Sequence, residues 1–334
     1  MCREVSFVLK DDILSALKES GTYCSGQVLC ERFGVTRSAV WKAIAKLREE
    51  GCVIDARPNR GYLLREEGDL MDGRALSEAL KENSFLKEIL FFRTIDSTNL
   101  EVKRRAEKGE EGPLLIVADE QTAGRGRRGR AWSSPPGTDI FMSMLLRPKV
   151  HPENAAMITL VTALAVAGGI QAATGLRVQI KWPNDVVIGG KKTCGILTEM
   201  STDLDEISYV VPGIGINVNS RVFPEEIAAT ATSLCLECGR TVHRVPVIAE
   251  FVRCFERYYG AFTETEDLSS LREVYESMLV NRDREVLVLD PKGSWRGTAE
   301  GITDKGELRV RRTDGTAVCV RSGEVSVRGI YGYV

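Results

Sequence analysis

Apolar and polar residues in segment 1–66 are spaced as in three short helices followed by a hairpin. Apolar residues recur at helical spacing in VLKDDILSALKE, and a glycine ends a second short helix in SGQVLCERFGV. Thr36 is placed to cap a third helix, along which Val40, Ile44 and Leu47 recur on one face. The segment CVIDARPNRGYLL has two strand-like runs around a Pro-Asn-Arg-Gly turn. This order predicts a winged helix-turn-helix.

Polar and basic residues at the start of the third helix are candidates for reading DNA. If the apolar face of this helix points inward, several of them point outward, where short polar and basic side chains suit the major groove. Two arginines of the hairpin are placed to reach phosphates. A winged helix used for protein contacts, or a solvated charged face, is the alternative. The candidate DNA-binding residues are Thr36, Arg37, Ser38, Trp41, Lys42, Arg57 and Arg60.

Beyond this segment the pattern predicts an α+β chain. A charged, helical connector is followed by alternating helical and strand-like runs, which fit a mixed α/β domain. The long apolar run MITLVTALAVAGGIQAA is shorter than a membrane span and is interrupted by glycines and a glutamine, so we expect a buried helix. Short strands with Gly and Asp turns near the end predict a small β-barrel. The predicted parts are 1–66 (winged helix-turn-helix), 67–84 (linker), 85–281 (central domain) and 282–334 (barrel).

Composition limits the class of protein. Of 334 residues, 43% are hydrophobic and 28% are charged, as in soluble globular proteins, and the net charge of −2 means that nucleic-acid binding must come from a local patch. Nine scattered cysteines and a charged amino-terminal segment, unlike a signal peptide, predict a cytoplasmic protein with free thiols. Cys235 and Cys238 form a single C-x-x-C without a second ligand pair, so we predict no metal site built by the protein.

The stretch QTAGRGRRGRAW contains G-x-G-x-x-G at Gly124, Gly126 and Gly129, yet it does not fit a dinucleotide fingerprint. That fingerprint needs a helix that begins within the glycines, and here two prolines and a strand-like run follow. Glycines alternating with arginines instead favour a mobile loop that closes over a polyphosphate, and Trp132 is placed to stack on a base or cap an apolar cavity. A basic surface patch or a localisation signal is the alternative. The arginines are Arg125, Arg127, Arg128 and Arg130.

Four further stretches fit an anionic substrate, each with a simpler structural interpretation. DSTN (96–99) is a polar clamp or a helix cap, and KWPNDV (181–186) is a charged turn or only a turn. GGKKTCGIL (189–197) places Lys191 and Lys192 on a glycine turn before an apolar strand, as part of an anion site or simply as surface lysines. GIGINVN (213–219) places Asn217 in a strand whose small residues permit close approach of a ligand, or simply a buried glycine-rich strand.

Covalent chemistry is disfavoured because His151 and His243, the only histidines, have no nucleophile beside them in the sequence. The chemistry that remains is stabilisation of charge around phosphate by Arg and Lys, together with Mg²⁺.

DSTN, DEQTAGRGRRGRAW, KWPNDV, KKTCGIL and GIGINVN, in this order, resemble the biotin–protein ligase family. With the winged helix in front, essentially the whole chain is similar to the bifunctional bacterial biotin ligases that also repress the biotin operon. The resemblance implies an SH3-like carboxyl-terminal barrel. It also implies two reactions: biotin and ATP, with Mg²⁺, give biotinyl-5′-AMP, and biotin then passes to a lysine of the biotin carboxyl carrier protein of acetyl-CoA carboxylase.

The resemblance also implies roles for individual residues. Catalytic roles fall to Arg125, Arg127, Lys192, Lys181 and Asp185, with Lys181 structural or electrostatic and Asp185 placed to orient or deprotonate the incoming amine. The implied biotin-binding residues are Ser97, Thr98, Asn99, Gln121, Arg125, Gly126, Arg127 and Lys192. The implied ATP and adenylate residues are Arg127, Arg128, Arg130, Trp132 and Asn217.

Regulation is implied as well. In the family, biotinyl-5′-AMP is the corepressor, and it favours a homodimer whose winged helices bind the biotin operator. Three other hypotheses stay open from the sequence. They are a lipoate-type protein ligase, a ligand-sensing repressor without catalysis, and an oxidoreductase, the last weakened by the absence of a predicted helix after the glycines.

Overall fold

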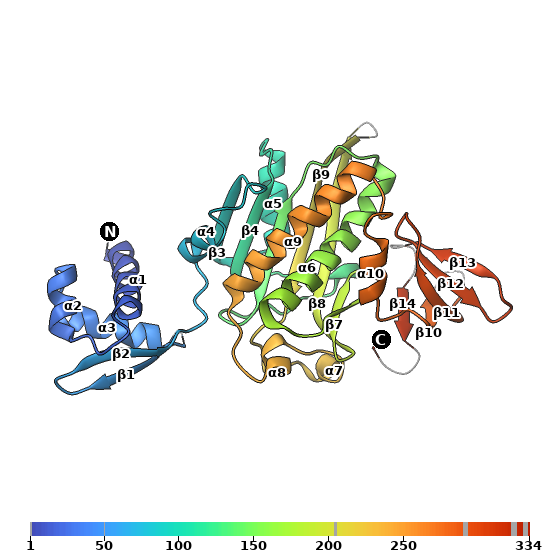
Figure 1. The fold of residues 1–334 in the computed structure, drawn as a ribbon. Coiled ribbons are helices and arrows are strands. Elements are labelled where there is room, and N and C mark those ends of the chain that lie inside the picture. The colour runs from blue at the N-terminus through green and yellow to red at the C-terminus, as the bar shows by residue number, and fades with distance from the viewer. Residues whose placement is uncertain (1, 50, 204–205, 290–292, 322–325, 330–332) are drawn as a thin grey trace. The chain divides into compact units, whose positions relative to one another are not determined.

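The computed structural model describes residues 2–49, 51–203, 206–289, 293–321, 326–329 and 333–334. The chain forms two compact units, Met1–Leu70 and Met71–Val334 (Figure 1).

The first unit is a three-helix domain with a two-stranded wing. Gly34 ends the second helix in the left-handed conformation at φ 64°, and Oγ1 of Thr36 accepts a hydrogen bond from the backbone of Ala39 at 3.3 Å, as predicted for a cap. Val40 and Ile44 lie in the buried core of this unit, so the predicted inward face is confirmed. The elements are α1 Cys2–Ser20, α2 Gly26–Phe33, α3 Arg37–Glu49, β1 Val53–Arg57 and β2 Gly61–Glu66.

The second unit is built on a seven-stranded sheet in the order β3-β4-β5-β9-β8-β7-β6, in which only the β3–β4 pair is parallel (Figure 1). The strands are β3 Glu88–Ile95, β4 Leu114–Gln121, β5 Ile140–Leu145, β6 Gln179–Lys181, β7 Asp185–Ile188, β8 Lys191–Asp203 and β9 Glu206–Ile216. The helical elements are α4 Gly73–Ala79, α5 Thr98–Glu107, η1 Arg127–Gly129, η2 Pro152–Met157, α6 Ile158–Thr174, α7 Glu225–Ala228, α8 Leu234–Cys238, α9 Arg244–Thr265 and α10 Arg272–Met278.

Helices cover both faces of this sheet. Helices α6 and α9 pack together with strand residues in the main core, and α5 packs through Val102 and Ala106 on residues of β4, β5 and β9 in a separate cluster. Gly169 of α6 allows α9 to approach, because a Cβ there would lie 2.7 Å from the backbone of Phe251. Segment Pro152–Thr174 is apolar and long enough to span a membrane, but 72% of its most apolar window is buried within the protein, so it is a core helix.

The end of the chain forms a five-stranded antiparallel sheet in the order β13-β12-β11-β10-β14. Its strands are β10 Arg284–Leu289, β11 Trp295–Ile302, β12 Leu308–Arg312, β13 Ala317–Val320 and β14 Ser326–Gly329. Buried Trp182 joins this sheet to the central one, since its indole nitrogen donates to the Gly306 carbonyl at 3.0 Å and its backbone nitrogen to Oδ1 of Asn281 at 3.1 Å. The predicted fold class is therefore confirmed.

Three local features refine the sequence predictions. Asn217 does not lie in a strand as predicted, because β9 ends at Ile216 and Oδ1 of Asp139 then accepts a hydrogen bond from the backbone nitrogen of Val218 at 2.7 Å. In the stretch 121–132, called the arginine loop below, only the short 3₁₀ turn η1 follows Gly124 and Gly126, and no α-helix begins there. Within predicted linker 67–84, α4 contributes Leu76 to the main core.

Candidate functional site

The DSTN stretch lies where β3 ends and α5 begins. Ser97 is the cap residue of α5, and Ser97, Thr98 and Asn99 are all buried. Asp96 shapes this turn, because its Oδ1 accepts the backbone N–H of Ser97 at 2.7 Å while its carboxylate pairs with Arg104. Ser97 thus occupies the cap position of α5 without a side-chain capping hydrogen bond, and the buried polar cluster is present.

A buried hydrogen-bond network fixes this cluster against the sheet. Oε1 of Gln121 accepts from the backbone and the hydroxyl of Thr98 at 2.9 and 3.1 Å, and the Gln121 amide donates to the Ser134 hydroxyl at 3.1 Å. The Ser143 hydroxyl lies 2.7 Å from Oγ1 of Thr98 and 2.5 Å from Oδ1 of Asn99. The side chains of Thr98, Asn99 and Gln121 are therefore held in place by protein partners before any ligand arrives.

The arginine loop is a compact turn of backbone hydrogen bonds. The backbone nitrogen of Gly126 donates to the Arg130 carbonyl at 2.7 Å, and that of Trp132 to the Gly124 carbonyl at 3.0 Å. Arg127 donates to Oδ1 of Asn184 at 2.6 Å, which ties the loop to the KWPND turn. Arg125 and Arg130 are exposed, and the side chain of Arg128 lies outside the described part of the chain.

The indole ring of Trp132 packs on two paired glycines of the central sheet, Gly195 and Gly215, which together are called the glycine window. Gly195 of β8 is the register partner of Gly215 of β9, and a Cβ at either would lie 2.9 and 2.6 Å, respectively, from the indole ring. The indole Nε1 is buried without a hydrogen-bond partner within the described part of the protein. An aromatic ring that packs on glycine backbone and whose N–H lacks a hydrogen-bond partner offers a surface that suits a planar polar ligand.

Charged residues of the β6–β7–β8 segment converge beside this ring. Nζ of Lys192 lies 2.6 Å from Oδ1 of Asp185 and 5.4 Å from the centroid of Trp132. The other oxygen, Oδ2 of Asp185, accepts the hydroxyl of Tyr333 at 2.5 Å. Nζ of Lys181, a residue only 6% exposed, lies 3.4 Å from the Tyr333 ring centroid. Two lysines and one carboxylate from three consecutive strands thus form one charged cluster.

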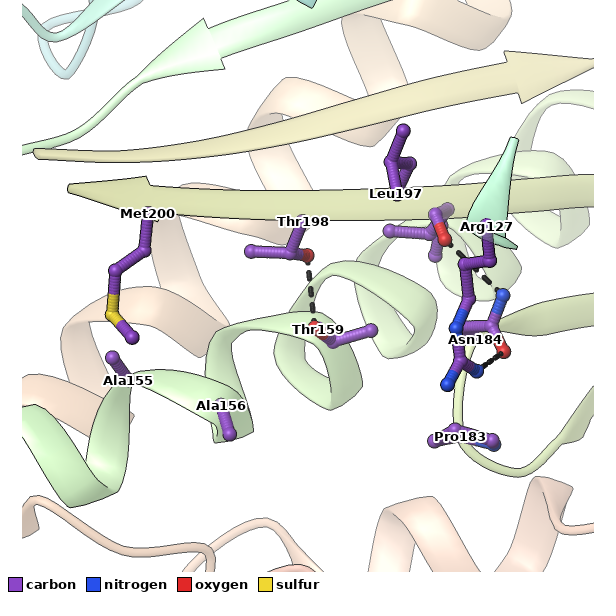
Figure 2. A pocket seen from close by; sticks show the side chains of 10 residues that line it. Arg127, Ala155, Ala156, Thr159, Pro183, Asn184, Leu197, Thr198 and Met200 are labelled. Atoms are coloured by element: carbon purple, nitrogen blue, oxygen red, sulfur yellow. Dashed lines mark hydrogen bonds between the residues drawn. The ribbon is translucent and has the colours of Figure 1, made fainter. Parts of the chain in front are cut away.

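A cavity of about 280 Å³ opens on the other face of β8. Figure 2 shows Arg127 reaching Asn184 at one end of it and Thr159 joined to Thr198 in its middle. Ile196 and Thr198 line it, whereas Gly195 lies on the Trp132 side, as expected from the alternation of side chains along a strand. The cavity is also lined by Ala155, Ala156, Pro183, Leu197 and Met200.

The structure brings Trp132, Lys192 and Asp185 together, places Arg127 at the cavity on the other face of β8, and gives Asn217 a different setting. The Asn217 amide donates to the Thr232 carbonyl at 3.1 Å, which anchors the segment that follows β9. The sequence did not predict that Gly195 and Gly215 pair beneath Trp132, because the sequence of one strand does not specify which residue of the next strand lies opposite it. It also missed Ser134, Ser143, Asn184 and Tyr333, of which only Asn184 lay in a stretch already singled out.

The candidate DNA residues lie on the surface of the first unit. Trp41 is 62% exposed, and Thr36, Arg37, Ser38 and Lys42 are exposed as well. On the wing, the guanidinium carbons of Arg57 and Arg60 lie 5.3 and 6.0 Å from the ring centroid of Tyr23. These positions are accessible, as phosphate and base contacts require.

Comparisons with known proteins agree across the chain. Residues 91–217 match the biotin/lipoate A/B protein ligase family, 10–63 an HTH domain, and 283–328 the biotin protein ligase C terminal domain. The chain is 36% identical over 311 residues to the bifunctional ligase/repressor BirA of Bacillus spizizenii, covering 92% of this chain and 95% of that relative. It is 30% identical over 317 residues to BirA of Escherichia coli strain K12, covering 94% and 96%.

Solved structures give the same family. The biotin protein ligase from Aquifex aeolicus in complex with biotin and ATP aligns with a TM-score of 0.65 at 33% identity, covering 73% of this chain and 99% of that chain. Together with the relatives that align from the winged helix to the final sheet, this places the chain: it belongs to the biotin/lipoate A/B protein ligase family, among its bifunctional ligase/repressors.

Proposed function

We propose that the protein is an ATP-dependent biotin–protein ligase that also represses transcription of the biotin operon. The observation that carries the enzymatic half is the position of Trp132 on the Gly195–Gly215 window beside the Lys192–Asp185 pair, with Arg127 of the arginine loop hydrogen-bonded to neighbouring Asn184. Relatives that cover more than nine tenths of the chain and a structure with biotin and ATP support this assignment.

The first reaction joins two anions. A carboxylate oxygen of biotin attacks the α-phosphorus of ATP, a new P–O bond forms, and the bond to pyrophosphate breaks. Biotin's carboxylate is ionised at neutral pH, so this step needs no general base. It needs positive charge where the negative charges meet, and Lys192 together with Arg125 and Arg127 supplies that charge.

The second reaction transfers the acyl group. The amine of a carrier-protein lysine attacks the carbonyl carbon of biotinyl-5′-AMP, an amide forms, and AMP leaves while the nitrogen loses a proton. Asp185 is the carboxylate that we propose orients the amine or accepts this proton. Its two oxygens contact Lys192 and Tyr333, so those contacts must rearrange for either role.

We assign residues to the biotin and adenylate sides of the site from the family's motifs. Ser97, Thr98, Asn99 and Gln121 shape the biotin side, where the side-chain network is already fixed. Trp132 packs against the nucleotide, and Arg128, Arg130 and Asn217 are assigned to the adenylate side.

Mg²⁺ is proposed to enter with ATP. Among the described residues no group of three or more His, Cys, Asp or Glu side chains is arranged to hold a metal. We propose that substrate phosphates and water hold the ion.

For the regulatory half we propose that biotinyl-5′-AMP is the corepressor, that the liganded protein forms a homodimer in the cytoplasm, and that the exposed α3 residues read the operator. The accessible positions of Arg37, Trp41 and Lys42 support the DNA-contact assignment. We also keep the division into a winged helix-turn-helix domain, a linker, a ligase domain and an SH3-like carboxyl-terminal domain as a proposal.

Exchange of labelled pyrophosphate into ATP tests the enzymatic proposal, with biotin and lipoate as alternative acids. We expect exchange that depends on biotin. Exchange with lipoate alone would move the protein to the other branch of the family, and a lack of exchange with either acid would favour a sensor that represses without catalysis. Retention of operator DNA, relative to scrambled DNA, by protein loaded with biotinyl-5′-AMP tests the repressor half.

A further inference from the structure

Residues at the end of the chain contact the ligase site at three points. The Tyr333 hydroxyl donates to Oδ2 of Asp185 at 2.5 Å. The Tyr333 ring lies under the ammonium group of Lys181, 3.4 Å from Nζ to the centroid. Val334 reaches the β7–β8 turn, since a Cβ built on Gly190 would lie 3.3 Å from its Cγ2. The turn that leads to Lys192 is therefore bounded by chain from the far end of the sequence.

Each contact bears on the charge of the site. Oδ1 of Asp185 pairs with Lys192 and also accepts the amide of Asn184 at 3.2 Å. Tyr333 donates to the other oxygen, Oδ2. A hydrogen bond at Oδ2 fixes the plane of the carboxylate and thereby the direction in which Oδ1 faces Lys192. The aromatic face beneath Lys181 compensates a buried ammonium group by a cation–π contact.

We propose that Tyr333 is a positioning residue of the ligase site: its hydroxyl aligns Asp185, and through Asp185 it sets where Lys192 presents its charge to biotin and ATP. The proposal rests on the ligase function proposed above. Without the hydroxyl, the carboxylate is free to turn and to hold Lys192 more tightly, so less of the lysine's charge reaches the reacting carboxylate and phosphate. The ring contributes separately through Lys181.

Two substitutions separate the hydroxyl from the ring. Tyr333→Phe removes the hydrogen bond to Asp185 and keeps the ring under Lys181, whereas Tyr333→Leu removes both. In the full-length protein we expect Tyr333→Phe to lower kcat/KM for biotin-dependent pyrophosphate exchange by roughly tenfold, the usual weight of a hydrogen bond to a charged group, and Tyr333→Leu to lower it further. Tyr209→Phe, six residues from Gly215 along β9, is the matched control and should leave the rate unchanged.

A double-mutant cycle distinguishes positioning from general stabilisation. If Tyr333 acts through Asp185, the loss caused by Tyr333→Phe should vanish in an Asp185→Asn background, and the melting temperature of the single variant should stay near that of the wild type. Wild-type kcat/KM in Tyr333→Phe, or the same loss in both backgrounds, would overturn the proposal. Failure of the wild-type protein to catalyse exchange would instead overturn the proposed function, so the two failures are distinguishable.

Discussion

At the scale of single residues, the charges of the site fall into two groups. Lys192, Asp185 and Lys181 are bound to one another or to neighbouring side chains, which fixes their positions. Arg125 and Arg130 extend from the loop into solvent. The cluster holds its charged groups in fixed positions, whereas the exposed arginines lie on a glycine-rich loop that we propose closes over the substrate. Substitutions in the loop should therefore change the reaction rate more than the stability of the fold.

Arg125→Ala should therefore slow adenylation. The loss of one charged donor from the transition state should cost about 2–4 kcal/mol, by analogy with a single oxyanion-hole donor. Pyrophosphate exchange measures it, with exposed Arg177→Ala as the control that removes equal charge elsewhere. Unchanged adenylate formation in Arg125→Ala would remove this residue from the mechanism.

Asp96 predicts a pH dependence of stability. The hydrogen bond from the Arg104 guanidinium is the main cause that holds the pKa of Asp96 below its ordinary value. Because the folded-state pKa is depressed, its stabilising contribution is complete above the unfolded pKa near 4 and is lost as the pH falls through the lower folded value. Asp96→Asn should thus lower the melting temperature at pH 7 and flatten its decline below about pH 4. Parallel melting curves for the two proteins across that range would contradict the assignment.

At the scale of elements, one strand serves both the fold and the site. Gly213 and Gly215 of β9 point to the same sheet face, yet they meet different neighbours. A Cβ at Gly213 would lie 2.0 Å from Oδ1 of Asn99, which is buried and hydrogen-bonded, whereas one at Gly215 would press on Trp132, which a loop carries. The Asn99 side chain is fixed by hydrogen bonds to Ser143 and Glu199, whereas the Trp132 indole nitrogen has no hydrogen-bond partner among the described residues.

The same substitution at these two positions should therefore have different consequences. Gly213→Ala should lower the free energy of unfolding by about 1–3 kcal/mol, the usual cost of overpacking. Gly215→Ala should lower it less and should mainly change biotin and ATP binding, because Trp132 is displaced. Chemical denaturation and ligand titration of both variants measure the two effects, and an equal loss of stability would show that Trp132 is as rigidly held as Asn99.

At the scale of the whole molecule, the chain consists of two units with separate hydrophobic cores. The first core contains Leu17, Leu29 and Val40, and the main core of the second contains Val161 and Phe251. The carboxyl-terminal sheet belongs to the second unit and contacts the central sheet through Trp182. Because the two cores are separate, we expect that deleting one unit removes its activity and leaves the other unit folded.

Deletion of residues 1–70 should abolish operator binding and leave biotin-dependent exchange. Exchange kinetics, circular dichroism and DNA retention of the truncated and full-length proteins check this. A truncated protein that folds and yet has lost exchange would mean that the amino-terminal unit supports the ligase site, contrary to the expectation from separate cores.

The sequence by itself determined the local elements and the chemistry. Periodicity gave the three helices and the wing, turn residues gave Gly34 and Thr36 as helix boundaries, and the order of polar stretches indicated the family, because these signals depend on neighbours along the chain. Tertiary structure decided which residues meet. Register placed Gly195 beside Gly215 under Trp132, β9 ended before Asn217, and the tertiary fold brought Tyr333 to Asp185. Such contacts join residues distant in sequence, and they depend on strand pairing and packing that no local pattern specifies.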